Sequence, residues 1–121
     1  MQVTTPVADA LGRYLDLSSQ ELKLTAQNMA NVDTPGYRTV GFDFAAEMSR
    51  SVQQLSRGSG DVVTPSVAPV DGLLERPDGN NVSMDREGLK MAEAQLQFRT
   101  GVQLLRSEFT RVMDAIHEDQ K

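Results

Sequence analysis

The chain has no cysteine, a single histidine and few aromatic residues, which make up 5% of its 121 positions. Without cysteine it forms neither disulfides nor thiolate metal sites, although a cysteine-free protein suits an oxidising or a reducing compartment equally. Hydrophobic residues reach only 39%. The core of a lone monomer of this length would therefore be thin, and assembly with other chains would supply the missing burial.

The chain also lacks a basic excess and a long hydrophobic run. Its 12 Lys and Arg against 17 Asp and Glu give a net charge of −5. This charge argues against a nucleic-acid partner, whose phosphates require a basic face, and against an anionic membrane surface. No window approaches the roughly 20 apolar residues of a spanning helix, and no basic segment followed by an apolar run opens the chain. We therefore expect neither membrane insertion nor a cleaved secretory signal.

What the chain does contain is a long amphipathic segment at each end. In both segments, selected positions recur alternately three and four residues apart, which is the spacing of a coiled-coil contact. Such segments suit either assembly between chains or an antiparallel helical hairpin within one monomer, and periodicity alone does not separate the two. The N-terminal seam comprises Ala8, Leu11, Leu15, Ser18, Leu22, Thr25 and Met29, and the C-terminal seam comprises Met91, Gln95, Phe98, Val102, Leu105, Phe109, Val112 and Ile116.

These patterns predict a mainly α fold, with long N- and C-terminal helices that carry coiled-coil-type seams. Thr5 or Thr4 is suited to cap the first helix, with Pro6 in its first turn. Ser83 is suited to cap the last helix, which we expect to reach about Ile116. The expected parts of this single structural domain are an N-terminal core helix (1–31), an elbow and arm (32–57), an irregular or β-containing insert (58–82) and a C-terminal core helix (83–121).

The elbow is predicted from its turn residues. Asn31 is suited to a left-handed conformation that ends the first helix. Pro35 and Gly36 occupy the central positions favoured by a type II turn. The arm that follows is expected to fold back onto a helix through Tyr37, Val40, Phe42 and Phe44.

The rest of the middle region has a weaker pattern. Residues 45–57 are ambiguous, with apolar spacing that suits a short helix broken by Gly and Ser at 56–60. Residues 58–81 are rich in Gly, Pro, Ser and Asp, and we expect an irregular insert with one hairpin there.

Candidate chemical sites are few, and each has a simpler interpretation. His117 is the only histidine and lies near the C-terminus, where a solvated side chain is the simplest reading. Residues 78–81 resemble the start of an EF-hand loop, but the position that requires Glu holds Leu89, so a turn before a helix is favoured. We therefore predict no catalytic, metal or cofactor site. Dipole partners on solvated faces are the expected role of Asp85, Glu87 and Glu93.

One segment resembles a known family. The run NMANVDTPGYR at residues 28–38 resembles the N-terminal signature of the flagellar rod and hook family of bacterial axial proteins, in which Asn-apolar-Ala-Asn leads into Asn/Asp-Thr-Pro/Thr-Gly-Tyr/Phe-Lys. The run DGNNVSMDRE at 78–87 is similar to the turn that opens the C-terminal helix of proximal-rod members. The signature positions are Asn28, Ala30, Asn31, Asp33, Thr34, Pro35, Gly36 and Tyr37.

The resemblance implies a structural, non-catalytic subunit of the basal-body rod, which crosses the periplasm and transmits torque for motility. It implies helical assembly in which the seams meet other axial proteins: sibling subunits, a FliE-like junction protein between rod base and MS ring, and the next proximal-rod protein, FlgC. It also implies passage through the flagellar type III export apparatus without a cleaved signal. The alternative from the residues themselves is a soluble helical adaptor or export-chaperone-like binding module, which would not need the elbow.

Overall fold

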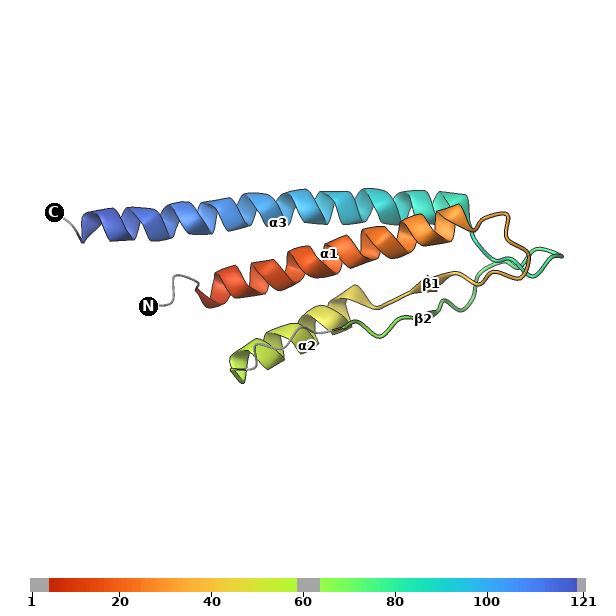
Figure 1. Ribbon diagram of the computed structural model, residues 1–121, viewed down its shortest axis with the longest axis horizontal. Coiled ribbons are helices and arrows are strands. Elements are labelled where there is room, and N and C mark those ends of the chain that lie inside the picture. Colours follow the sequence, from red (N-terminus) through yellow and green to blue (C-terminus); the bar gives the residue numbers. More distant parts are fainter. Residues whose placement is uncertain (1–4, 59–63, 120–121) are drawn as a thin grey trace.

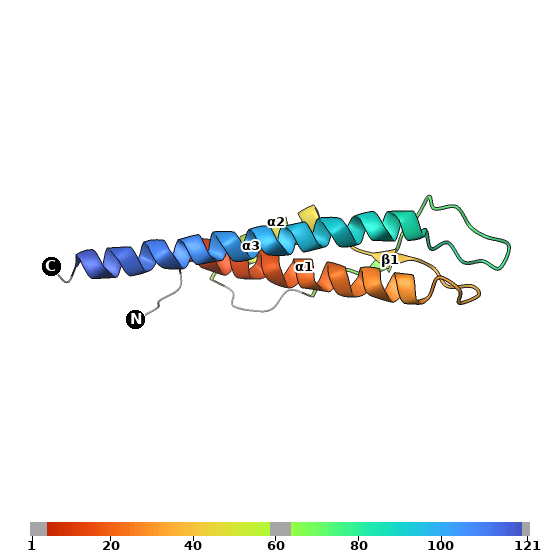
Figure 2. The ribbon, with the colours of Figure 1, turned by 90° about the horizontal axis from the view of Figure 1, so that it is seen from above.

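The computed structural model describes residues 5–58 and 64–119 and shows an elongated molecule (Figure 1). Helices α1 (Pro6–Ala30) and α3 (Met84–Glu118) run antiparallel, and α2 (Phe44–Ser56) packs against α1. Strands β1 (Val40–Gly41) and β2 (Ala68–Pro69) form a two-stranded antiparallel sheet. A view turned by 90° confirms that α1 and α3 lie side by side, with the start of α1 and the end of α3 toward one end of the molecule (Figure 2). The mainly α fold with a small β-containing insert is as predicted.

The two long helices begin at predicted caps. The Thr5 hydroxyl oxygen accepts a hydrogen bond from the backbone N–H of Ala8 at 3.1 Å, and the Ser83 side chain accepts one from the N–H of Arg86 at 3.3 Å. These bonds satisfy donors that the first helical turn leaves unpaired. Helix α3 continues through Glu118, slightly beyond its predicted end.

The end of α1 differs from the expectation. Asn31 has a φ of −104°, so it is not left-handed. Its side-chain amide donates to the carbonyl of Gln27 at 2.8 Å, and its side-chain oxygen accepts from the Thr34 hydroxyl at 3.0 Å. Because the side chain itself satisfies a terminal carbonyl, the helix ends without a left-handed residue.

The predicted turn at Pro35 and Gly36 is present. Gly36 has a φ of +76°, and the N–H of Tyr37 donates to the carbonyl of Thr34 at 3.2 Å, which closes the turn. The arm then folds back as predicted, and the Phe44 ring meets the Tyr14 ring of α1 edge to face at 5.4 Å between centroids.

The ambiguous segment after the arm is the helix α2, capped by the Asp43 side chain. On the far side of α2, Glu47 accepts from the N–H of Ser66 at 3.0 Å, and Arg50 donates to the carbonyl of Thr64 at 2.9 Å. These two hydrogen bonds hold the chain at residues 64–66 against α2.

The insert corrects a second prediction. Within its described part, residues 64–82, no hairpin forms, and β2 pairs instead with β1 of the arm, with Val40 opposite Pro69. Pro69 lacks an N–H, which restricts β2 to a short edge strand. The predicted break at 56–60 is present where it is described, because α2 ends at Ser56 and Gly58 has a φ of +77°; residues 59 and 60 lie outside the described residues.

The contact between α1 and α3 is close, and the apolar core is as thin as the composition predicts. Along α3 the buried positions recur every seven residues, and the two central ones are small: Glu87, Ala94, Gly101 and Glu108. A Cβ atom at Gly101 would lie 2.7 Å from Leu15 Cδ2, so the helices approach at a distance that only glycine allows without rearrangement. Among the described residues, the buried hydrophobic side chains are Ala8, Leu17, Val82 and Ala94.

Candidate functional site

The clearest built site is a polar network at the elbow, where the end of α1, the arm and the start of α3 meet. We call it the elbow clasp and define it as Asn28, Tyr37, Asn80, Asn81 and Glu87. The Asn28 side chain is buried and makes four hydrogen bonds. Its amide donates to the Val40 carbonyl at 2.9 Å and to Glu87 Oε2 at 3.1 Å. Its oxygen accepts from the Tyr37 hydroxyl at 3.0 Å and from the Val40 N–H at 3.1 Å.

Glu87 is the charged member of the elbow clasp, and its position overturns a prediction. It was expected on a solvated face, but its side chain is only 1% exposed. Its place on the contact line with Ala94 directs it toward α1, where Asn28 lies. Arg86 donates to Glu87 Oε1 at 2.6 Å, so both carboxylate oxygens accept from a partner, as a buried charge requires. Asp85 and Glu93 are exposed as predicted.

Asn80 and Asn81 join the two loops of the elbow. The Asn80 amide donates to the carbonyls of Asn31 and Thr34 at 2.9 and 2.8 Å, and its oxygen accepts from the N–H of Val82. Asn81 Oδ1 accepts from the N–H of Thr39 at 2.7 Å. The four-residue run that begins at Asp78 is therefore a turn before α3, as predicted, and it binds backbone atoms of the elbow.

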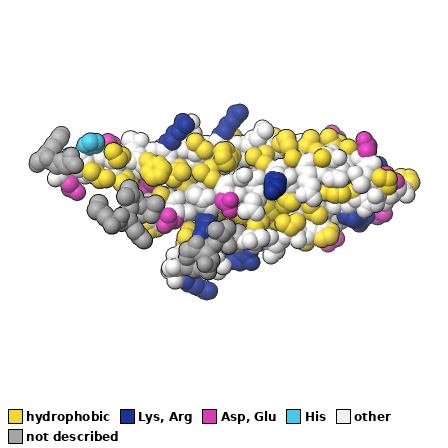
Figure 3. Space-filling model, in the orientation of Figure 1, with side chains coloured by type: hydrophobic (Ala, Val, Ile, Leu, Met, Phe, Trp, Pro, Cys, Tyr) yellow, Lys and Arg dark blue, Asp and Glu magenta, His cyan; other side chains and the backbone are white. Residues whose placement is uncertain are grey.

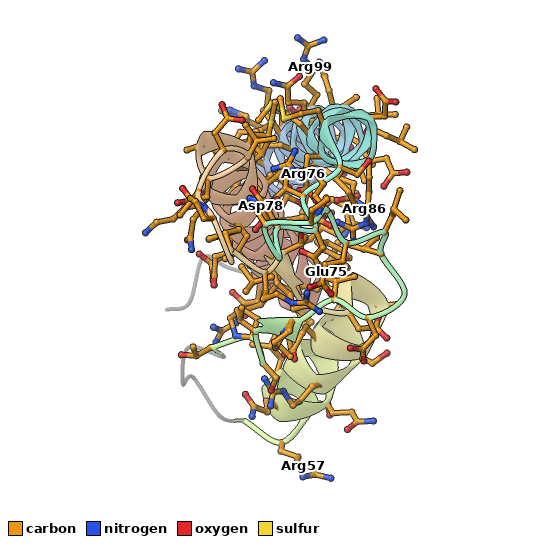
Figure 4. The ribbon with its side chains drawn as sticks, turned by 90° about the vertical axis from the view of Figure 1, so that its right-hand side faces the viewer. Arg57, Glu75, Arg76, Asp78, Arg86 and Arg99 are labelled. Atoms are coloured by element: carbon orange, nitrogen blue, oxygen red, sulfur yellow. The ribbon has the colours of Figure 1, made fainter. Side chains whose placement is uncertain are left out.

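Further bonds hold the same loops together. The N–H of Gly36 donates to the carbonyl of Asp78 at 2.9 Å, Arg38 pairs with Glu75 at 2.9 Å, and Arg76 donates to the carbonyl of Val32. Figure 4 looks onto the elbow end, where Glu75, Arg76, Asp78 and Arg86 lie near the centre of the view, whereas Arg57 and Arg99 project away from it.

The signature residues divide into buried and exposed groups. Asn28 is buried, and Asn31 and Tyr37 are partly buried. The remaining five lie on the exposed side of the elbow or at the last residue of α1: Ala30, Asp33, Thr34, Pro35 and Gly36. Sequence reasoning missed the role of Glu87. The similarity of residues 78–87 to a family turn was visible, but pairing across 59 residues leaves no local pattern.

The C-terminal seam does not coincide with the line along which α3 meets α1. That line is one position away, at Ala94 and Gly101, so the seam lies on its flank. The side chains of Phe98 and Phe109 are 39% and 46% exposed. Figure 3 shows hydrophobic side chains gathered along α3 on the face in view. Gln95 is exposed, and the other members of this seam are partly buried: Met91, Val102, Leu105, Val112 and Ile116.

The N-terminal seam faces α3 more directly. Ala8, Ser18 and Thr25 are buried, and the larger members Leu11, Leu15, Leu22 and Met29 are partly buried. Beside them, α1, α2 and α3 leave an apolar groove of about 480 Å³. Its lining includes Pro6, Val7, Ala10, Leu11, Met48 and Leu104. The intramolecular hairpin is therefore real, yet it leaves apolar surface uncovered on both long helices.

At the end opposite the elbow, a polar connection joins the long helices. Thr5 donates to Glu108 Oε1 at 2.7 Å, and Arg111 donates to the same oxygen at 2.9 Å. These hydrogen bonds, from Arg111 first and Thr5 second, hold the pKa of Glu108 below its ordinary value. Midway along α1, burial raises the pKa of Glu21.

Within residues 5–58 and 64–119, no three His, Asp or Glu side chains gather in a way that could hold a metal ion. No helix in this part of the chain is long and apolar enough to cross a membrane. What the described residues offer is a polar elbow and uncovered apolar helix faces.

Comparison with known proteins identifies the family. No protein-family model matches the chain. The flagellar basal body rod protein FlgB of Escherichia coli K12 is 32% identical over 120 aligned residues, which cover 84% of this chain and 86% of that protein. The chain belongs to the FlgB family of flagellar basal body rod proteins. FlgB of Cereibacter sphaeroides is 31% identical, with 93% of this chain and 97% of that protein covered. FlgB of Salmonella typhimurium LT2 is 29% identical, with 84% and 86% covered.

As a member of the FlgB family, the chain is a structural component of the bacterial flagellar basal-body rod. The resemblance drawn from residues 28–38 and 78–87 is thus confirmed at the level of the family. In this FlgB-family chain the two segments that carried the resemblance lie together, bonded to each other through the elbow clasp.

Proposed function

We propose that this FlgB-family chain enters the rod through its two long helices, with the C-terminal seam of α3 against neighbouring axial subunits. The observation that carries the proposal is the offset of this seam from the α1 contact. Phe98 and Phe109 keep 39% and 46% of their surface exposed although they lie in a regular apolar row. Burial of that row by a neighbour would add the apolar contact that the thin core lacks.

The contacts we propose are with sibling subunits, a FliE-like junction protein and FlgC, through interfaces that repeat head to tail. Heterologous interfaces of this kind build open helical assemblies, which suit a rod that transmits torque. The chain would reach this periplasm-spanning rod through the type III export apparatus without a cleaved signal. We propose no enzymatic activity, cofactor, nucleic-acid partner or membrane insertion. The names of its relatives favour this role over a soluble adaptor or export-chaperone-like module.

The test is to place a charge in the C-terminal seam and follow export and assembly separately. Leu105→Asp and Phe109→Asp would put a carboxylate into a contact that becomes dry on assembly, at a cost on the order of several kcal/mol. Each variant replaces the native protein in a flagellated host. We expect exported protein at the normal level, with incomplete rods and loss of swimming.

Ser107→Asp is the matched control, because Ser107 is exposed and lies between these two positions outside the seam. It adds the same charge and should leave rod completion unchanged. Normal motility of both seam variants would remove the seam from the mechanism. Loss of export would assign the residues to the export step instead.

A further inference from the structure

We propose that the elbow clasp closes as one cooperative unit in the unassembled chain, with Glu87 as the residue that positions the Asn28 amide. The clasp would then hold the end of α1 against the start of α3 before the chain binds a neighbouring subunit. This inference stands apart from the assembly role, because every bond it uses lies within a single chain.

Every hydrogen-bonding group of the Asn28 side chain has a partner. Both of its amide hydrogens and both acceptor positions of its oxygen are occupied, by two backbone groups of Val40 and by the side chains of Tyr37 and Glu87. A buried amide left with unpaired groups is costly. An elbow in which only the arm or only α3 is docked would leave some of these groups unpaired, so partial closure is disfavoured.

Glu87 brings a buried charge to the elbow clasp. The carboxylate is 1% exposed and accepts from Asn28 on one oxygen and from Arg86 on the other. Removal of one partner from a buried charge is strongly destabilising. The Glu87 carboxylate is therefore buried only when Asn28 is in place, and Asn28 is held in place by the carboxylate. This mutual dependence makes closure all-or-none.

The elbow differs from the opposite end of the molecule. At that end the Thr5 side chain, which caps α1, donates to Glu108 of α3, and an open apolar groove lies beside the start of α1. The elbow combines several buried bonds across its loops, including Asn80 to Asn31 and Thr34, and Asn81 to Thr39. Regions with few buried contacts open first, so protection should be greatest at the elbow.

Amide hydrogen exchange on the purified, unassembled chain tests the proposal. The N–H groups of Gly36, Thr39, Val40 and Val82 are bonded within the elbow. We expect them to exchange together and at least about tenfold more slowly than the amides of the first turns of α1. Exchange of the elbow amides at the rates of an unfolded chain would overturn the proposal.

A pair of substitutions separates a cooperative clasp from independent bonds. Glu87→Gln keeps the shape of the side chain but replaces one of its two acceptor oxygens with an N–H₂ group. Because Asn28 and Arg86 both donate to this side chain, one of them then faces another donor. Asn28→Asp places a second carboxylate against Glu87. In the double variant, the amide at position 87 can donate to the carboxylate at position 28 and its oxygen can accept from Arg86, so the contact between positions 28 and 87 matches again, whereas the Val40 carbonyl still lacks its donor.

We expect each single substitution to speed exchange of all four elbow amides by at least about tenfold, and the double variant to recover part of the protection lost in Asn28→Asp. Glu93→Gln, at an exposed position of the same helix, is the control and should change nothing. Effects confined to the amide that each side chain touches would overturn the proposal. So would a double variant no better protected than Asn28→Asp alone.

Discussion

Gly36 carries the left-handed conformation on which the elbow turn depends. Its φ is +76°, and a Cβ atom built on it would have no neighbour within 4 Å. Substitution at this position therefore tests backbone conformation without a steric clash. L-residues pay roughly 1–2 kcal/mol in this region, β-branched residues the most, whereas Asn visits it readily.

We expect Gly36→Val to destabilise the elbow by about 2 kcal/mol and Gly36→Asn by less than about 1 kcal/mol. Pro35→Ala should be milder than Gly36→Val, because the turn can form without proline and loses only its preset φ. The measurement is the exchange protection of the Tyr37 N–H, which closes the turn. Equal losses for Val and Asn would refute the left-handed assignment.

At the scale of elements, two glycines of α3 form a matched pair. Gly88 would place a Cβ atom in open space, whereas Gly101 would place one 2.7 Å from Leu15 Cδ2 and 3.1 Å from Tyr14 Cδ1. Both substitutions to Ala should favour the helix by about 0.5–1 kcal/mol through propensity. At Gly101 an overpacking cost on the order of 1–3 kcal/mol opposes this gain.

We therefore expect Gly88→Ala to raise the denaturation midpoint of the chain and Gly101→Ala to lower it or leave it unchanged. Denaturant unfolding of the two variants beside the native chain is the measurement. Similar gains at both positions would mean that α1 and α3 do not need glycine for their close approach.

The Thr5 to Glu108 connection predicts a response to acid. The pKa of Glu108 is lowered in the folded chain by its hydrogen bonds from Arg111 and Thr5. A lowered folded pKa means that the stabilisation is complete above the ordinary carboxyl value of about 4.3 and is lost as pH falls through the folded value. Acid should therefore loosen the start of α1.

The measurement is the exchange protection factor of the Ala8 and Asp9 amides between neutral pH and about pH 3, corrected for intrinsic rates. We expect protection to fall below the ordinary carboxyl pKa in the native chain, and Glu108→Gln to remove that step. An unchanged acid step in the variant would assign it to another group.

The sequence predicted these elements unevenly, for identifiable reasons. The helix caps at Thr5 and Ser83 and the turn at Gly36 depend on short-range chemistry, and all three were found where expected. The pairing of β1 with β2 and the burial of Glu87 depend on contacts between distant segments, which no local pattern records. The heptad spacing predicted a helix contact on α3, but small residues at Ala94 and Gly101 move that contact one position from the seam.

For the whole molecule, the balance of buried and exposed apolar surface predicts incomplete helix in the unassembled state. The described buried apolar core contains four residues, and α3 exposes several large hydrophobic side chains, including Leu89 and Leu96 at 62% and 66%. Isolated long helices depend on tertiary burial more than on propensity. The purified chain should therefore contain less helix than α1, α2 and α3 together.

Circular dichroism of the monodisperse chain, compared with the assembled rod, checks this expectation. The elbow should keep its structure while the far ends of α1 and α3 lose theirs. A purified chain with all three helices at full length and one cooperative melting transition would contradict it.

The distance along the chain between the partners of the elbow clasp also sets an order of events in time. Asn28 and Glu87 are separated by 59 residues. A ribosome releases the chain from its N-terminus, so the amide of Asn28 emerges long before the carboxylate that will orient it. Throughout that interval the end of the first helix has no fixed position against the last, and water satisfies its polar groups. The elbow clasp can therefore close only after residue 87 has been synthesised.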